Sequence, residues 1–228
     1  DQNVPSRDPH PVWITLTAHE RELYDRIEEY ISTFYNKYEK RRAGLGFVMT
    51  IYRRRLTSSF YAVRKSLERR LAFLEGRVNE WVTDEDTEQG DLSEDLTEID
   101  EGPDGALYRE EIDYVKNFLH ELTILGNVDS KVEQLLLELN RLFLRHRTVL
   151  VFTQYTDTMD YLREVLTETY GTKVACYSGR GGEVWNGIAW VEVPKEQIKR
   201  EFREGDTIRI LLCTEAASEG LNLQTCGV

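Results

Sequence analysis

Three short apolar runs, each followed by small polar residues, constrain the fold of this chain most. The runs are Val149–Phe152, Lys173–Tyr177 and Ile208–Cys213. Short apolar, β-branched runs of this length between turn signals are typical of buried strands. Helical patterns separate them, one after Asp157 and one from Pro194 to Arg203. The alternation of strand and helix predicts an α/β fold with a parallel sheet and right-handed crossovers.

The polar residues after these runs form the first candidate site. Ligands of open α/β sheets bind outside the carboxyl ends of the strands, which parallel strands place at one edge. The hydroxyls, amides and backbone N–H groups there would form a row of hydrogen-bonding groups along that edge. An ordinary strand–loop–helix connection is the alternative. The candidate residues are Thr153, Gln154, Ser178, Gly179 and Thr214.

Four spaced segments carry a family resemblance. They are Asp129–Leu135, Val149–Tyr155, Tyr177–Gly179 and Cys213–Gln224. In this order they resemble the second RecA-like lobe of superfamily II helicases, in the Swi/Snf branch of ATP-dependent DNA translocases. The segment Ser218-Glu-Gly-Leu-Asn222 is similar to the bacterial and archaeal branch close to the RNA-polymerase-recycling ATPase RapA. The resemblance is less specific over residues 11–125.

The resemblance implies the C-terminal lobe of an ATP-dependent motor that contacts the nucleic-acid backbone and forms one wall of an ATP cleft. It places Gly220, Asn222 and Gln224 on the nucleotide side of that cleft. It also implies that the strand-end residues contact the nucleic-acid backbone, for which hydroxyls, amides and backbone N–H groups are suited because such contacts do not depend on base sequence. These residues are Thr153, Gln154, Ser178, Gly179 and Thr214. The implied partners are nucleic acid, specifically duplex DNA, and a missing N-terminal RecA-like lobe. ATP and Mg²⁺ are expected in the complete protein, held mainly by that other lobe. None is expected on this chain alone.

Two departures from the family pattern limit this interpretation. No GxxxxGK[ST] loop occurs, since Gly44-Leu-Gly46 is followed by Phe47 without a lysine to reach a phosphate. The printed chain also ends at Val228, before the arginine-bearing final motif of the family. We therefore expect part of a motor that does not hydrolyse ATP alone. A non-catalytic nucleic-acid or protein-binding scaffold is the alternative. A Rossmann-type enzyme is disfavoured because no GxGxxG follows the first strand.

Composition changes along the chain predict five segments. They are an inter-lobe linker with a leading strand (1–16), a helical subdomain (17–82), an acidic linker (83–107), a helix returning to the lobe (108–128) and the truncated second RecA-like lobe (129–228).

The helical subdomain contains a dense basic stretch. Thr17 and Glu20 form a capping-box pattern before a first helix. A second helix is expected from Phe47 to Leu74, with ten basic residues and one acid between Lys40 and Arg70. On that helix the basic residues opposite the apolar face are Arg54, Lys65 and Arg69. They could bind DNA phosphates, neutralise the acidic linker or form a solvated face, and the sequence leaves these three open.

The acidic linker dominates the charge of the chain. Residues 84–104 hold eleven acidic residues and no Lys or Arg, so without them the formal net charge of −12 would be −1. A solvated linker is the simpler interpretation. An acidic mimic that occupies a nucleic-acid groove is the alternative, and the sequence does not choose.

An insertion between the second strand and Pro194 predicts a β-hairpin. Asn186-Gly187 between apolar runs predicts a type I′ turn, with Trp185 and Trp190 on the two strands. The hairpin at 180–193 is expected to cover a sheet edge. The functional alternative is a protein partner or a DNA-backbone contact through Arg180.

Several classes of protein are disfavoured by composition. No apolar run reaches the roughly 18 residues that cross a bilayer, and no signal peptide precedes Trp13. Three cysteines (Cys176, Cys213 and Cys226) form no CxxC pair and are expected as reduced thiols, and four scattered histidines predict no metal site. We expect a cytoplasmic, nucleoid-associated prokaryotic protein without a membrane partner.

Overall fold

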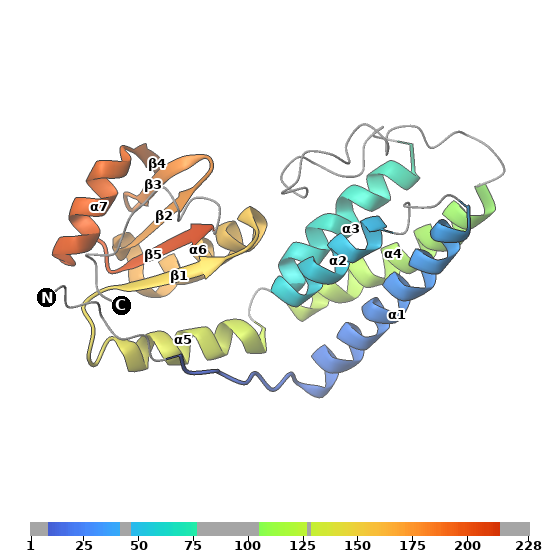
Figure 1. Cartoon of the computed structure of the whole chain (residues 1–228), viewed down its shortest axis with the longest axis horizontal. Helices are drawn as coiled ribbons and strands as arrows, with labels where there is room; N and C mark the ends of the chain where they lie inside the picture. Colours follow the sequence, from blue (N-terminus) through green and yellow to red (C-terminus); the bar gives the residue numbers. More distant parts are fainter. Residues whose placement is uncertain (1–8, 42–46, 77–104, 127–128, 215–228) are drawn as a thin grey trace, which may run out of the picture. The chain divides into compact units, whose positions relative to one another are not determined.

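The chain divides into two compact units (Figure 1). The computed structural model describes residues 9–41, 47–76, 105–126 and 129–214. The helical unit spans 17–129, and the sheet unit combines 1–16 with 130–228. In sequence, the helical unit is thus an insertion within the sheet unit. Residues 9–17 form neither helix nor strand, so the leading strand expected before residue 17 is not found. The finer division of the chain stays a prediction.

The sheet unit contains a five-stranded, mostly parallel sheet. Its order is β1-β5-β2-β3-β4, and the three predicted strands β1, β5 and β2 pair in parallel. The hairpin strands β3 and β4 continue the sheet antiparallel beside β2. The strands are β1 Val149–Thr153, β2 Val174–Ser178, β3 Gly181–Trp185, β4 Trp190–Val193 and β5 Ile210–Thr214. The predicted α/β fold class is confirmed, and it is consistent with a RecA-like lobe.

Helices cover both faces of this sheet. The chain runs from β1 through α6 (Thr156–Tyr170) and a 3₁₀ turn (Gly171–Lys173) to β2, and through α7 (Lys195–Glu204) to β5. The connection from β1 to β2 and the connection from β4 to β5 cross the sheet in opposite directions. Right-handed connections therefore place α6 and α7 on opposite faces of the sheet. Ile198 and Phe202 of α7 pack on Leu211 of β5. Helix α5 (Ser130–Leu142) leads the chain into β1.

The hairpin forms as predicted, but its turn is different. Trp185 pairs with Trp190, so four residues, not two, connect β3 to β4. The Asn186 side chain makes this longer turn because its Oδ1 accepts the N–H groups of Ile188 and Ala189, both at 2.9 Å. The type I′ turn expected at Asn186-Gly187 is therefore wrong. The Asn186 N–H also donates to the Ala189 carbonyl at 3.1 Å, so the connection closes one position later than a turn at Asn186-Gly187 would.

Gly182 fixes the distance between the hairpin and α7. A Cβ at this position would lie 2.5 Å from Ile198 Cδ1 and 2.9 Å from the Val193 carbonyl oxygen. Only a residue without a side chain allows β3 to approach the buried Ile198 so closely. Gly179, just after the end of β2, has open space instead, because a Cβ there would meet no atom within 4 Å.

We predict that Gly182→Ala lowers the free energy of unfolding by about 1–3 kcal/mol, because overpacking forces Ile198 and the β4 backbone apart. Gly179→Ala is the matched control and should change it by less than about 0.5 kcal/mol. Urea unfolding followed by circular dichroism measures both. Equal midpoints for the two variants would contradict the packing argument.

The described residues of the helical unit form four helices that contact one another in a ring. They are α1 Ala18–Arg41, α2 Phe47–Ser58, α3 Phe60–Leu74 and α4 Gly105–Leu125. Each contacts the next in sequence, and α4 also contacts α1. The predicted capping box starts α1, since Thr17 N–H donates to Glu20 Oε2 at 2.7 Å and Glu20 N–H donates to Thr17 Oγ1 at 3.2 Å. Helix α4, expected to return to the lobe, belongs to this unit.

The single helix expected from Phe47 to Leu74 is broken at Ser59. Ser59 is extended (φ −164°, ψ 155°), and its Oγ accepts the Ala62 N–H at 2.9 Å as the N-cap of α3. A serine side chain competes with the helix backbone for hydrogen bonds and therefore favours the N-cap position. The prediction of one long helix followed the spacing of apolar residues and did not take this signal into account. Arg54 therefore lies on α2, whereas Lys65 and Arg69 lie on α3. The three residues therefore do not share one helix, and their binding of DNA phosphates stays a prediction.

A buried ion pair lies at the centre of the helical unit. Arg70 and Glu111 have fully buried side chains, and the guanidinium contacts both carboxylate oxygens, Nε to Oε1 at 2.9 Å and Nη2 to Oε2 at 2.6 Å. Tyr30 donates to Oε1 at 2.7 Å, and Tyr38 donates to Oε2. Burial alone would lower the pKa of Arg70, but the Glu111 carboxylate outweighs it and raises that pKa above its ordinary value. The Arg70 guanidinium therefore stays charged although it is buried.

We predict that Arg70→Met lowers the free energy of unfolding by about 3–5 kcal/mol, because Glu111 loses its buried counter-charge. The double variant Arg70→Met/Glu111→Leu should recover most of that loss. Arg53→Met is the control, since Arg53 pairs with Glu28 on the surface and such pairs contribute below about 1 kcal/mol. Chemical denaturation of the three variants checks the order, and a double variant no more stable than Arg70→Met would overturn it.

Within the part of the chain that the structure describes, no helix has the length and apolar character needed to cross a membrane.

Candidate nucleic-acid interface

The polar strand ends predicted from the sequence meet at one edge of the sheet. Thr153 of β1 is the register partner of Thr214 of β5. On the other side of β5, Tyr177 pairs with Cys213, which sets Ser178 beside Thr214. Three adjacent parallel strands therefore end in a row of hydroxyl residues. This is the edge where open α/β sheets bind ligands.

The hydroxyls in this row are buried and partly used by the chain itself. Thr153, Ser178 and Thr214 are 8%, 4% and 5% exposed. Thr153 Oγ1 lies 3.3 Å from the Tyr155 carbonyl and 3.4 Å from the Tyr155 N–H, and Ser178 Oγ accepts the Arg180 N–H at 3.2 Å. These bonds shape the loops that follow the strands. A ligand at this edge would meet the half-buried Gln154 and the exposed Gly179 first.

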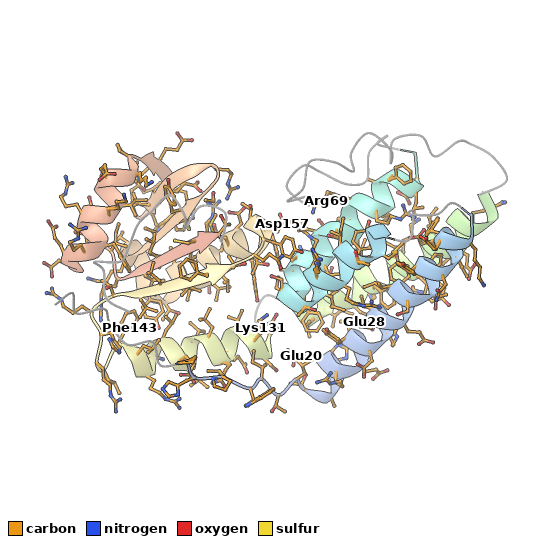
Figure 2. The ribbon with its side chains drawn as sticks, viewed as in Figure 1. Glu20, Glu28, Arg69, Lys131, Phe143 and Asp157 are labelled. Carbon is orange, nitrogen blue, oxygen red and sulfur yellow. The ribbon has the colours of Figure 1, made fainter. Side chains whose placement is uncertain are left out.

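Arg180, considered as a DNA-backbone contact, is held by α6 instead. Its Nη1 and Nη2 donate to the two carboxylate oxygens of Asp160, at 3.1 and 2.5 Å. A bidentate pair of this kind is strong and geometrically specific. Asp157, labelled in Figure 2, lies in the first turn of α6, which begins at Thr156.

The same face of α6 also contacts the hairpin formed by β3 and β4. Arg163 contacts Glu183 of β3 at 3.1 Å and lies 4.9 Å from the ring centroid of Trp190. The Trp190 indole donates to Glu164 Oε1 at 3.1 Å. The expected role of the hairpin, coverage of the β2 edge, is therefore supported by direct contacts. A protein partner at 180–193 stays a prediction.

The basic candidates of the helical unit have different surroundings. Arg54 of α2 is exposed and has no partner among the described residues. Lys65 of α3 contacts Glu68 at 2.9 Å. Arg69, labelled on α3 in Figure 2, is half-buried and already engaged within the chain. Of these three, Arg54 is the side chain most available to an external anion.

Neither buried thiols nor a metal centre add chemistry to the described part. Burial raises the pKa of Cys213 to about 12 and raises that of Cys176 as well, so both thiols stay neutral near pH 7. No group of three His, Cys, Asp or Glu residues suited to a metal ion occurs among the described residues. Cys226 and the predicted nucleotide-side residues Gly220, Asn222 and Gln224 lie outside the described residues.

Comparison with known proteins agrees with the geometry of the sheet unit. Residues 130–228 match the family model of the helicase conserved C-terminal domain. No curated protein matches the chain. The match contains α5, the whole sheet and the row of strand ends, and it implies a helicase-superfamily nucleic-acid motor lobe. It begins one residue after the helical unit ends.

Two networks of charged side chains near these candidates, one around Arg163 and one around Arg70, were not predicted from the sequence. Arg163 lies at neither an apolar position nor a strand end, and nothing in the sequence indicates three carboxylates around it. Arg70 did carry a signal, because it follows Leu67 by three residues on the apolar face of α3. A charged residue at a core position predicts a buried partner.

Proposed function

We propose that this chain supplies the C-terminal lobe of an ATP-dependent DNA translocase of the Swi/Snf type, in the RapA-like branch. The observation that carries the proposal is the row of strand ends Thr153, Thr214 and Ser178 at one edge of a mostly parallel sheet. That row lies in the segment that matches the helicase C-terminal domain. Backbone contacts to nucleic acid come from this edge, through Gln154, Gly179 and the loop amides around them.

ATP and Mg²⁺ belong to the complete motor in this proposal. The printed sequence has no phosphate-binding GxxxxGK[ST] loop, so a second RecA-like lobe holds the phosphates. Gly220, Asn222 and Gln224 provide the wall of the cleft opposite that lobe. Closure of the two lobes around ATP moves one lobe along duplex DNA, while the strand-end row keeps hold of the backbone.

We predict that the full-length protein hydrolyses ATP slowly and that duplex DNA accelerates it, whereas residues 1–228 alone bind DNA without turnover. Steady-state phosphate release with and without DNA measures this. DNA binding without any turnover in a folded full-length protein would favour the non-catalytic scaffold. A protein that neither binds nor responds to DNA or RNA would refute the proposal, and stimulation by RNA alone would refute the DNA assignment.

We predict that Gln154→Ala weakens duplex binding about two- to tenfold without loss of stability, because a lost hydrogen bond contributes about 0.5–1.5 kcal/mol. Asn140→Ala is the control. Its side-chain oxygen accepts from Tyr170 at 3.2 Å, and Tyr170 ends α6 just before β2 begins, at the opposite edge of the sheet. Fluorescence anisotropy with a labelled duplex compares the two. Equal affinities would remove Gln154 from the interface.

A further inference from the structure

The outer face of α3 carries an unusual arrangement of two cations, one carboxylate and one aromatic ring. Glu68 Oε1 lies 3.1 Å from Arg64 Nε, and Glu68 Oε2 lies 2.9 Å from Lys65 Nζ. Both cations also lie 5.5 Å from the ring centroid of Tyr61. The four residues occupy positions i, i+3, i+4 and i+7, which form one face of a helix. We call these residues the α3 cation cluster.

The α3 cation cluster is accessible to a ligand. The side chains of Arg64, Lys65 and Glu68 are 26%, 32% and 40% exposed. Opposite them on the same helix, Val63, Leu67 and Leu74 belong to the core of the helical unit. The core therefore fixes which way the cluster faces.

The charge balance of the cluster favours an anion. Two cations share one carboxylate, which leaves a surplus of one positive charge. A second dense network, around Arg163 of α6 and Arg180 between β2 and β3, has three carboxylates for two cations and so a negative surplus. On α1, Arg21 faces Asp25 and the Tyr24 ring, a neutral pair with the same aromatic neighbour.

We infer that the α3 cation cluster binds a backbone phosphate of nucleic acid and that Glu68 occupies the phosphate position when nucleic acid is absent. A carboxylate and a phosphodiester each offer two oxygens and one negative charge, so either can bridge Arg64 and Lys65. The Tyr61 ring holds both cationic side chains in place by cation–π contact, so they are positioned before the ligand arrives. This inference rests on the proposed function, because it assumes that the protein binds nucleic acid.

The competition between Glu68 and phosphate has a measurable signature. Binding releases the counterions condensed on the phosphates of the nucleic acid, so affinity falls as salt rises. Salt also weakens the competing pairs of Glu68 with Arg64 and Lys65, which offsets part of that fall. Without the Glu68 carboxylate nothing offsets it, and the dependence of affinity on salt becomes steeper. An internal competitor thus lowers both the affinity and its sensitivity to salt.

We predict that Glu68→Gln raises duplex affinity about two- to tenfold at low salt and steepens the slope of log K against log salt by up to about 0.9. Lys65→Gln should lower affinity by a similar factor and flatten the slope. Adding Lys65→Gln to Glu68→Gln should cancel most of the gain. The probe is a labelled duplex of random sequence, titrated at several salt concentrations.

Asp25→Asn on α1 is the matched control, since it makes the same charge change in the same unit beside a cation and a tyrosine. It should leave affinity and slope nearly unchanged, and thermal unfolding should show all variants folded. If the protein binds DNA but Glu68→Gln behaves like Asp25→Asn, the inference is overturned while the proposed function stands. If the unaltered protein binds no nucleic acid, both are overturned.

Discussion

The parallel pairing of β5 between β1 and β2 is the constraint on which the candidate interface depends. All five residues of β5 are buried, so this strand has no solvent-facing side and must be covered by helices on both faces. Its register fixes Thr214 beside Thr153 on one side and next to Ser178 on the other. A shift of one residue would turn Leu211 and Leu212 to the wrong faces. The core therefore sets the position of the polar edge.

The helical unit uses a different source of specificity. Helices α1 and α4 pack through aromatic rings, Tyr30 against Phe118 and Phe34 against Tyr114, and apolar contacts of this kind are not directional. The carboxylate of Glu111 accepts from Arg70, Tyr30 and Tyr38, which lie on two other helices. A rotated helix would leave at least one of these polar groups buried without its partner, which is costly. We infer that the network selects one packing rather than adding much stability.

The sequence was sufficient for the elements whose signal is local. Apolar runs at Val149 and Ile210, the capping box at Thr17 and the Trp185–Trp190 hairpin were all predicted, because each depends on residues a few positions apart. Features that depend on residues far apart in the sequence were not predicted. The order β1-β5-β2 and the pairing of Arg70 with Glu111, 41 residues away, depend on contacts that periodicity does not contain. At the candidate interface, residue types were predictable, but the burial of the hydroxyls was not.

The distribution of basic residues separates those that hold the fold from those that are available to a ligand. Arg70, Arg163 and Arg180 are each held by carboxylates of other elements, so they stabilise packing and offer little to an external phosphate. Arg54 and the α3 cation cluster retain positive charge at the surface. The dense basic stretch from Lys40 to Arg70 therefore contains residues that hold the fold and residues that are available to a ligand, and composition alone does not distinguish them. Burial decides between them, because a guanidinium inside the core needs its own carboxylate, whereas a half-exposed one can exchange Glu68 for phosphate.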